Sequence, residues 1–272
     1  MRLEGGGAGR SRVAVVTGAS SGIGAALARK LSAGGWHCVL LARRRDRLEA
    51  VAREVGGEAE ICDVAEREEV AATAQRVAEQ HPSIRLLVNN AGIPGCGEFL
   101  TVPPERIEQI IRINYLGTVW CTREFLPLLE ADAPADIANV VSVAGTVAGG
   151  AGGPYAAAKH AQIAFSRASA LELEPRGIRV HTVNPGFAHT EGFPQDRILN
   201  HPWARHLVLT EAEVADAVLK AVAQNRREVF VPGFYRLPAA LQGAMPATFS
   251  HVLGWWNRRV EEPQDSEDKG KP

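Results

Sequence analysis

The sequence is poor in cysteine, in net charge and in long apolar runs, and each shortage removes a class of protein. Its four cysteines, Cys38, Cys62, Cys96 and Cys121, are far apart and form no C-x-x-C pair. Buried thiols are therefore expected rather than disulfides, and no metal site is predicted. A net charge of −1 offers no surface for nucleic acid. No apolar run reaches the roughly 20 residues that span a bilayer.

Both ends of the chain lack the apolar character of a structural segment. Residues 1–11 are rich in glycine and contain no signal-peptide core, so they are predicted to be a flexible tail. Residues 261–272 are charged and are predicted to be a disordered tail. Between them we expect one cytoplasmic domain over 12–236, which a helical extension continues over 237–260.

Short apolar runs alternate with helical patterns along the chain. The predicted strands are 13–17, 38–42, a run ending at 64, 85–88, 139–143, 179–183 and 228–231. The predicted helices are 23–33, 46–55, 66–80, 104–129, 156–172 and 211–224. This alternation predicts an α/β fold in which a doubly wound parallel sheet of Rossmann type carries helices on both faces.

A glycine-rich turn follows the first apolar run. Val13–Thr17 leads into Gly18-Ala-Ser-Ser-Gly-Ile-Gly24 and then into a helix. Glycine lets the backbone approach a phosphate closely, and a helix N-terminus offers unpaired N–H groups to its charge. Such a turn is often only a turn, but strand, glycines and helix in this order favour a dinucleotide phosphate site.

Three arginines, Arg43, Arg44 and Arg45, follow the second apolar run. A dinucleotide fold reads the ribose 2′ position at this point, where an acid would bind a free hydroxyl and an arginine suits a phosphate. The alternative is a basic cap on the next helix. With the glycine-rich turn upstream, the pattern favours NADP(H) over NAD(H), with Arg43 as the direct contact.

A possible proton donor lies in the predicted helix that begins near residue 155. Tyr155 and Lys159 are four residues apart, so they share one helix face. A cation beside a phenol lowers its pKa from a reference value near 10. Alone this signal is weak, because the same spacing occurs on many solvated helices.

Together these motifs resemble the short-chain dehydrogenase/reductase family, in its compact single-domain branch, over about residues 13–232. Asp63-Val64 is similar to its adenine contact, Asn89–Gly92 to its fourth-strand motif, and Pro185-Gly186 with Thr190 to the segment that holds the nicotinamide carboxamide. The resemblance implies cofactor binding by Gly18, Ser20, Ser21, Gly22, Ile23, Gly24, Arg43, Asp63, Val64, Asn90, Ala91, Gly92, Tyr155, Lys159, Pro185, Gly186 and Thr190.

Asn114, Ser142, Tyr155 and Lys159 match the catalytic four of that family in order and spacing. The resemblance implies hydride transfer between a nicotinamide and a carbonyl or alcohol carbon of a small molecule. In it, Tyr155 acts as general acid or base, and Lys159 lowers its pKa and binds the nicotinamide ribose. Ser142 hydrogen-bonds the substrate oxygen, and Asn114 holds a water that links Lys159 to solvent. Assembly as a homodimer or homotetramer is implied too.

The C-terminal stretch matches no family motif. Apolar residues recur every three or four positions from Leu237 to Val260, and Pro246 predicts two helices that meet near it. We expect this stretch to pack near Tyr155 with the 187–206 loop, which would make the pocket apolar and the substrate hydrophobic. A partner subunit is an alternative place for the stripe, and a membrane surface ranks below both.

Two other functions compete with an NADP(H)-dependent oxidoreductase. One is a nucleotide-binding regulator or scaffold with little turnover, which the four intact catalytic positions disfavour. The other is a membrane-associated reductase of lipid or steroid carbonyls, which would differ in where the C-terminal stretch lies.

Overall fold

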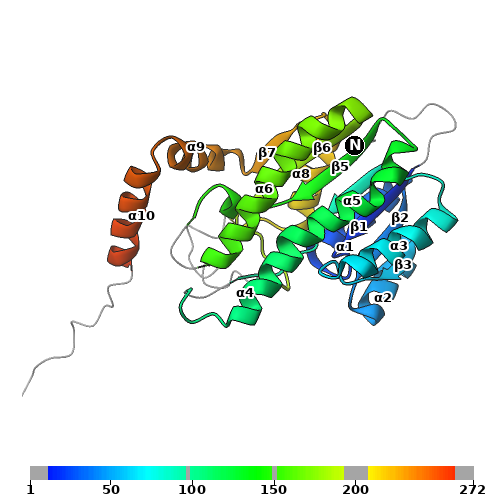
Figure 1. Cartoon of the computed structure of the whole chain (residues 1–272), viewed down its shortest axis with the longest axis horizontal. Helices are drawn as coiled ribbons and strands as arrows, with labels where there is room; N and C mark the ends of the chain where they lie inside the picture. Colours follow the sequence, from blue (N-terminus) through cyan, green and yellow to red (C-terminus); the bar gives the residue numbers. More distant parts are fainter. Residues whose placement is uncertain (1–11, 96–98, 149–151, 193–207, 261–272) are drawn as a thin grey trace, which may run out of the picture.

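The computed structural model describes residues 12–95, 99–148, 152–192 and 208–260, and for 256–260 only the backbone. Its centre is a seven-stranded parallel sheet in the order β3-β2-β1-β4-β5-β6-β7 (Figure 1). The strands are β1 Val13–Thr17, β2 His37–Ala42, β3 Glu58–Ile61, β4 Leu86–Asn89, β5 Ala135–Val140, β6 Ile178–Pro185 and β7 Glu228–Val231.

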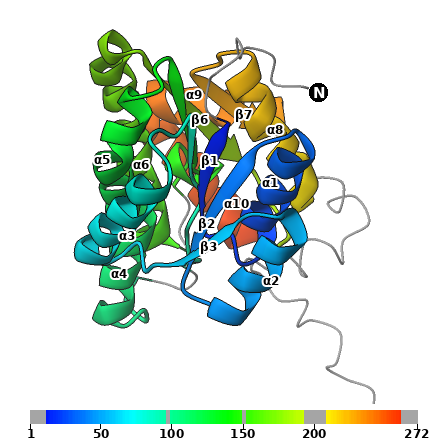
Figure 2. The ribbon, with the colours of Figure 1, turned by 90° about the vertical axis from the view of Figure 1, so that its right-hand side faces the viewer.

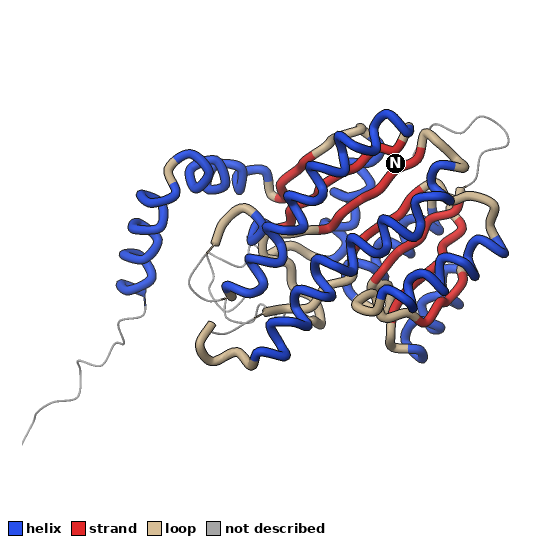
Figure 3. Tube along the Cα trace, viewed as in Figure 1, coloured by secondary structure: helices blue, strands red, loops and turns tan. Residues whose placement is uncertain are grey.

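Helices cover both faces of the sheet, which confirms the doubly wound fold (Figure 2). One face carries α1 Gly22–Ala33, α2 Arg45–Val55 and α8 Glu211–Ala223. The other carries α3 Arg67–Gln80, α5 Gly117–Glu130 and α6 Gly153–Leu173, with α4 Pro104–Ile111 leading towards α5. The strands alternate with helices along the tube, as Figure 3 shows by colour.

Two apolar clusters hold these layers together. Because side chains alternate across a strand, β1 serves both clusters: Ala14 and Val16 face α1 and α8, and Val15 faces α3 and α5. All three are completely buried. A central strand buried on both faces reads as one continuous apolar run, which is why this strand could be recognised in the sequence.

The strand β5 begins and ends earlier than predicted, and the reason is a set of buried polar pairs. Asp136 accepts from the Arg179 guanidinium at 2.7 Å and lies 2.8 Å from Nε2 of His181. Asn139 donates to Ser166 at 2.8 Å and accepts from Asn89 at 2.9 Å. These partners come from neighbouring elements, so the polar stretch just before the predicted strand belongs to a fully buried strand.

The predicted helix over 104–129 is broken by a π-helical turn, Arg112–Leu116, between α4 and α5. Such turns insert a residue into the α-helical ladder and are frequent at functional sites. Asn114 lies in this turn and is completely buried, so its side chain does not face solvent.

The C-terminal stretch forms two helices, α9 Arg236–Ala244 and α10 Pro246–Val260, which meet at Pro246 as predicted. They extend away from the sheet (Figure 1). Within this chain the apolar stripe is only partly buried, because Leu237 is 66% and Met245 50% exposed while Phe249 and Leu253 are partly buried. Among the described helices, none combines the length and the apolar character needed to cross a bilayer.

We expect Asp136→Ala to lower the unfolding free energy by about 1–3 kcal/mol, because it leaves Nε2 of the completely buried His181 without its hydrogen-bond partner. Glu174→Ala is the matched control, since Glu174 pairs with Arg227 at the surface and such pairs contribute about 0–1 kcal/mol. Urea denaturation measures both variants. Equal, small losses would show that the Asp136 pairs contribute nothing beyond a surface pair.

Candidate active site

A cavity of about 730 Å³ opens at the carboxyl ends of the strands, where ligands of doubly wound folds bind. Nearly all predicted site residues line it: Gly18, Ser20, Ser21, Gly22, Ile23, Arg43, Asp63, Val64, Asn90, Ala91, Gly92, Ser142, Tyr155, Lys159, Pro185, Gly186 and Thr190. Gly24 and Asn114 are the two predicted residues outside this lining. Each lies just behind it.

The glycine-rich turn leaves backbone room that side chains would fill. Gly18 has a φ of +67°, and a Cβ there would lie 2.8 Å from the Cα of Ala91. A Cβ on Gly24 would collide with the carbonyl oxygen of Gly18. Gly24 therefore serves close packing of α1 against the turn, and the N-terminus of α1 faces the cavity. This cradle fits the phosphates of a dinucleotide.

The ends of β1 and β4 are locked together beneath this turn. The hydroxyl of Thr17 accepts from the backbone N–H groups of Asn90 and Ala91, at 2.9 and 3.0 Å. The side-chain amide of Asn90 donates to the carbonyl of Thr17 at 3.0 Å. Asn90 thus lines the cavity, while its side-chain amide holds the two strands together.

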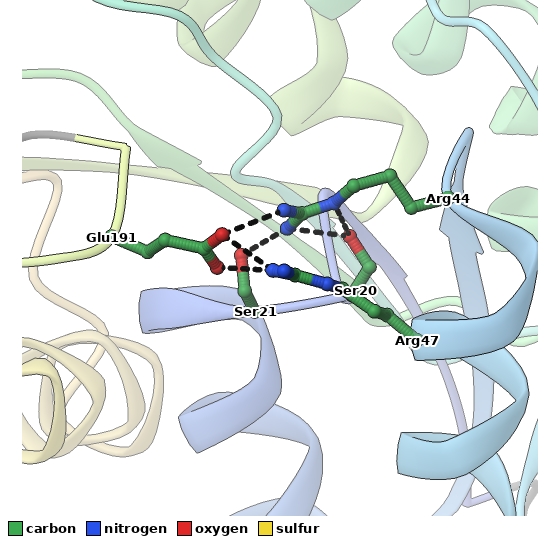
Figure 4. A network of polar contacts seen from close by, with 5 residues as sticks. All are labelled: Ser20, Ser21, Arg44, Arg47 and Glu191. Carbon is green, nitrogen blue, oxygen red and sulfur yellow. Dashed lines mark hydrogen bonds and ion pairs between the residues drawn. The ribbon is translucent and has the colours of Figure 1, made fainter.

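The three arginines after β2 point in different directions. Arg43 lies 3.2 Å from the carboxylate of Asp63, and Arg45 pairs with Glu49 within α2. Arg44 instead reaches back over the glycine-rich turn, where its guanidinium donates to Ser20 at 3.2 Å and also to Ser21 (Figure 4). Arg44 is therefore the arginine that lies on the glycine-rich turn. The sequence had indicated Arg43 instead.

A carboxylate from the far side of the cavity meets this arginine. Glu191 accepts from Arg44 at 3.2 Å and from Arg47 at 2.5 Å (Figure 4). Arg44 and Glu191 are 147 residues apart in the chain, so no local pattern announces this contact. The hydroxyls of Ser20 and Ser21 and the two guanidiniums form an anion-binding corner, and Glu191 fills it.

Tyr155 and Lys159 share one face of α6, as predicted, and Nζ of Lys159 lies 5.7 Å from the centroid of the Tyr155 ring. Lys159 is 3% exposed. Its ammonium donates to the side-chain oxygen of Gln162 at 2.8 Å and lies 3.4 Å from the carbonyl of Val140. Burial lowers the pKa of Lys159 to about 7. Both acceptors are neutral, so neither compensates the charge as a carboxylate would.

Gln162 is a site residue that the sequence analysis missed. It is completely buried, and its amide nitrogen donates to the hydroxyl of Thr118 at 2.8 Å while its oxygen accepts from Lys159. Gln162 lies about one helical turn beyond Lys159, and nothing in the alanine-rich sequence around it marks it as a functional residue. Its helical spacing of three from Lys159 is the only signal that could have indicated it.

Asn114 lies behind Gly92, at the same depth as Lys159. A Cβ on Gly92 would be 2.7 Å from Oδ1 of Asn114 and 3.8 Å from Nζ of Lys159. The Asn114 amide donates to the carbonyls of Ile93 and Ile110, and its oxygen accepts from the Ile93 N–H. The side chain is thus occupied in holding Ile93, a residue of the cavity wall, in place.

Ser142 lies directly after β5 rather than within it, and its hydroxyl accepts from the N–H of Ala144 at 3.1 Å. The neighbouring wall is apolar, with Ile93, Pro94, Val143, Val147 and Phe187 in the lining.

Among the described residues, Tyr235, which directly precedes α9, contacts residues that line the site. Tyr235 packs against Gly186, and its phenol forms a hydrogen bond with the backbone of Phe187. On α9, Gln242 accepts from the Ala148 N–H at 3.1 Å. No described residue of 237–255 lines the cavity. Most of the 187–206 loop that was expected to join it lies outside the described residues.

Fold and site together define a nicotinamide-type oxidoreductase, and comparison with known proteins agrees. The family model for short chain dehydrogenase matches residues 12–197, and the chain belongs to this short-chain dehydrogenase/reductase family. It is 33% identical over 221 residues to the granaticin polyketide synthase putative ketoacyl reductase 1 of Streptomyces violaceoruber, covering 79% of this chain and 80% of that protein.

Two solved structures have the same architecture. An alcohol dehydrogenase of the archaeon Thermococcus sibiricus, complexed with 5-hydroxy-NADP, is 28% identical with a TM-score of 0.71, covering 80% of this chain and 94% of that one. A short chain dehydrogenase/reductase of Burkholderia phymatum in complex with NAD has a TM-score of 0.77, covering 86% and 94%. At 24% identity the latter supports the fold alone. Relatives of this fold thus bind either nicotinamide cofactor.

We expect the stability of the protein to rise with pH through the titration of Lys159. Between about 7 and the ordinary pKa of 10.5, the unfolded chain carries a proton that the folded lysine has lost. The unfolding free energy should therefore gain up to about 1.4 kcal/mol per pH unit in this window. Below pH 7 the lysine is charged in both the folded and the unfolded chain. Burial of this charge then lowers the unfolding free energy the most.

Lys159→Met removes this titration, so its unfolding free energy should depend less on pH than that of the wild type. Urea denaturation of both proteins without cofactor at pH 7, 8 and 9 gives the comparison. Parallel curves for the two proteins would show that Lys159 keeps its ordinary pKa in the folded chain.

Proposed function

We propose that this protein is an NADP(H)-dependent oxidoreductase that interconverts a carbonyl and an alcohol on a hydrophobic small molecule. The observation that carries the proposal is the buried Lys159 beside Tyr155, at one end of a cavity whose other end is a dinucleotide-type turn. A cytoplasmic location agrees with the composition.

Tyr155, Ser142 and Lys159 each have a separate role in the proposed reaction. A bound nicotinamide supplies or accepts the hydride. In reduction, Tyr155 gives its phenolic proton to the substrate oxygen, and Ser142 donates a hydrogen bond to the same oxygen as charge develops there. The Lys159 ammonium stabilises the phenolate left behind and binds the nicotinamide ribose. Oxidation runs through the same groups in reverse.

Asn114 is a positioning residue in this scheme and does not touch the substrate. Its side chain exchanges hydrogen bonds with the backbone of Ile93 in the cavity wall and donates to the carbonyl of Ile110.

The cavity wall favours an apolar substrate. Besides Ser142 and Tyr155, the described residues that line the cavity include the apolar side chains of Ile93, Val143, Val147 and Phe187. A free sugar or a charged metabolite would lose hydrogen bonds to water there without replacement, which costs about 1–3 kcal/mol per buried polar group. Hydrophobic ketones, aldehydes and secondary alcohols fit this wall. The match to a ketoacyl reductase supports the same substrate class.

NADP(H) is the proposed cofactor because two arginines converge beside the glycine-rich turn. Arg44 lies on Ser20 and Ser21, and Arg47 approaches from the next turn of α2. Guanidiniums and hydroxyls at this place suit a 2′-phosphate. Glu191 then holds the place of that phosphate, and its carboxylate has to move aside when NADP(H) binds. We assign the direct contact to Arg44, with Arg43 beside it.

Replacing Tyr155 should separate catalysis from cofactor binding. We expect Tyr155→Phe to lower kcat by about 10²–10⁴-fold or more, because it removes the proton donor and keeps the ring. Ser142→Ala should cost about 10²–10³-fold in kcat. The oxidation of NADPH by a hydrophobic ketone measures both, and tryptophan quenching checks that the cofactor still binds.

Tyr115→Phe is the matched control, since Tyr115 packs on Phe165 outside the cavity lining and its hydroxyl has no part in the scheme. Tyr155→Phe with the activity of the control would overturn the mechanism. A wild-type protein that binds NADPH without turning over any ketone, aldehyde or alcohol would instead be a nucleotide-binding regulator.

Glu191→Gln should strengthen NADPH binding by about two- to fivefold, the range of an exposed ion pair, because it removes the carboxylate that competes for Arg44 and Arg47. NADH affinity should change little, since NADH brings no phosphate to this corner. Arg44→Ala should weaken NADPH binding by about tenfold or more. Titrations of both cofactors by tryptophan quenching measure these affinities.

Glu49→Gln is the control here, because Glu49 pairs with Arg45 away from the cavity. Weaker NADPH binding in Glu191→Gln would mean that Glu191 positions the arginines. Equal affinity of the wild type for NADH and NADPH would show that Arg44 does not read the 2′ position.

We further propose that two copies of the chain associate along α6. Ala157, Ala164 and Ala168 are exposed on one side of this helix, and Leu171, nearby in the chain, is 67% exposed. Small residues allow a partner helix to approach closely, as in an isologous two-fold contact. Light scattering should detect a dimer or tetramer at micromolar concentration, and Ala164→Glu should dissociate it. A wild-type monomer would contradict the proposal.

A further inference from the structure

Three side chains from separate elements converge at the end of the molecule opposite the cavity. His37 begins β2, Glu58 begins β3, and His81 follows the last residue of α3. Nε2 of His37 lies 2.6 Å from Oε1 of Glu58, and Nε2 of His81 lies 3.1 Å from both oxygens of the same carboxylate. The two imidazole rings are 5.2 Å apart.

The fold fixes this convergence through the backbone. Val39 pairs with Glu58 in the parallel register, so His37, two residues before Val39, lies on the same face of the sheet as Glu58. The helix α3 packs on that face through Val70 and Val77. The backbone N–H of His81 donates to Val77 at 2.8 Å, which sets the end of the helix above Glu58.

The carboxylate of Glu58 differs from its neighbour on the same strand. Glu60 lies two residues on, on the same face, and pairs with the guanidinium of Arg76 at 2.8 Å. Glu58 faces two imidazoles instead, and together they hold its pKa below the ordinary value although burial opposes this. In the part of the chain that the structure describes, this is the single group of three histidine, cysteine or acidic residues with a metal-ligand arrangement.

We propose that His37, Glu58 and His81 bind one divalent transition-metal ion of the zinc class. Two histidines and a glutamate form a common set of three protein ligands for zinc, with a water in the fourth tetrahedral position. Bonds of about 2.0–2.1 Å place tetrahedral ligand atoms roughly 3.3 Å apart. The three ligand atoms here already lie within 4.8 Å of one another, so small side-chain rotations complete the geometry.

The chemistry of the ligands selects the ion. Imidazole nitrogen suits zinc, cobalt, nickel and copper, whereas calcium and magnesium prefer oxygen. In the metal-free protein Nε2 of each imidazole donates to the Glu58 carboxylate, so a metal that binds there would replace these two protons.

The site is structural rather than catalytic. Its ligands lie at the amino ends of β2 and β3, and the cavity lies at the carboxyl ends of the same strands, about 17 Å away along a strand of this length. A bound ion would fasten the edge strand β3 and its neighbour β2 to the end of α3. The expected result of binding is thus a more stable fold with unchanged turnover.

Calorimetric titration of the untagged, chelator-treated full-length protein with zinc chloride tests the proposal. We expect saturable binding of one equivalent at pH 7.5 and a rise in Tm with added zinc. Loss of outer-shell partners alone costs about 10–100-fold in metal affinity, so Glu58→Gln, which loses a ligand, should bind about tenfold more weakly or worse. Its NADPH-dependent turnover should match the wild type.

Glu60→Gln is the matched control, from the same strand and the same face, and it should bind zinc as the wild type does. His37→Asn, at a partly exposed position, repeats the test if Glu58→Gln fails to fold. No saturable binding by the wild type would overturn the proposal. Equal binding by Glu58→Gln and Glu60→Gln would overturn it too, because the ion would then lie at other residues. Neither result bears on the proposed oxidoreductase activity.

Discussion

The burial of one ammonium group, that of Lys159, is the constraint on which the arrangement of the site depends. Its described hydrogen-bond partners, Val140 and Gln162, are neutral, so no ion pair compensates the loss of water around the charge. An uncompensated charge acts strongly on whatever titrates beside it in a medium of low polarity. In this molecule that neighbour is the ring of Tyr155. Burial by itself favours the neutral amine, so Lys159 acts on the phenol only in its charged form.

The rest of the molecule brings the two ends of a cofactor-sized cavity to this pair. Parallel strands place their carboxyl ends along one edge, so the turn after β1 and Ser142 after β5 face the same space. Thr17 and Asn90 lock β1 to β4 beneath it, and the π-helical turn holds the wall at Ile93 through Asn114. Each of these contacts joins segments far apart in sequence, which gives the site rigidity without a bound ligand.

The sequence predicted what depends on local spacing and on continuous apolar runs. The sheet, the glycine-rich turn and the shared face of Tyr155 and Lys159 are of this kind. It could not predict what depends on distant partners: the buried acid Asp136 within β5, the occupation of the Arg44 corner by Glu191, and the support of Lys159 by Gln162. The apolar stripe over 237–260 predicted the two helices but not the exposure of Leu237 and Met245, because periodicity indicates a face and not what covers it.

The central claim is that Lys159 activates Tyr155, and the ionisation of this one phenol tests it most directly. The chain has three tyrosines, so subtracting the ultraviolet pH titration of Tyr155→Phe from that of the wild type isolates a single phenolate signal. With NADP(H) bound, we predict that this signal appears well below the ordinary value near pH 10, and that Lys159→Met moves it upwards. A phenolate that forms at or above pH 10, or at the same pH in both proteins, would contradict the account.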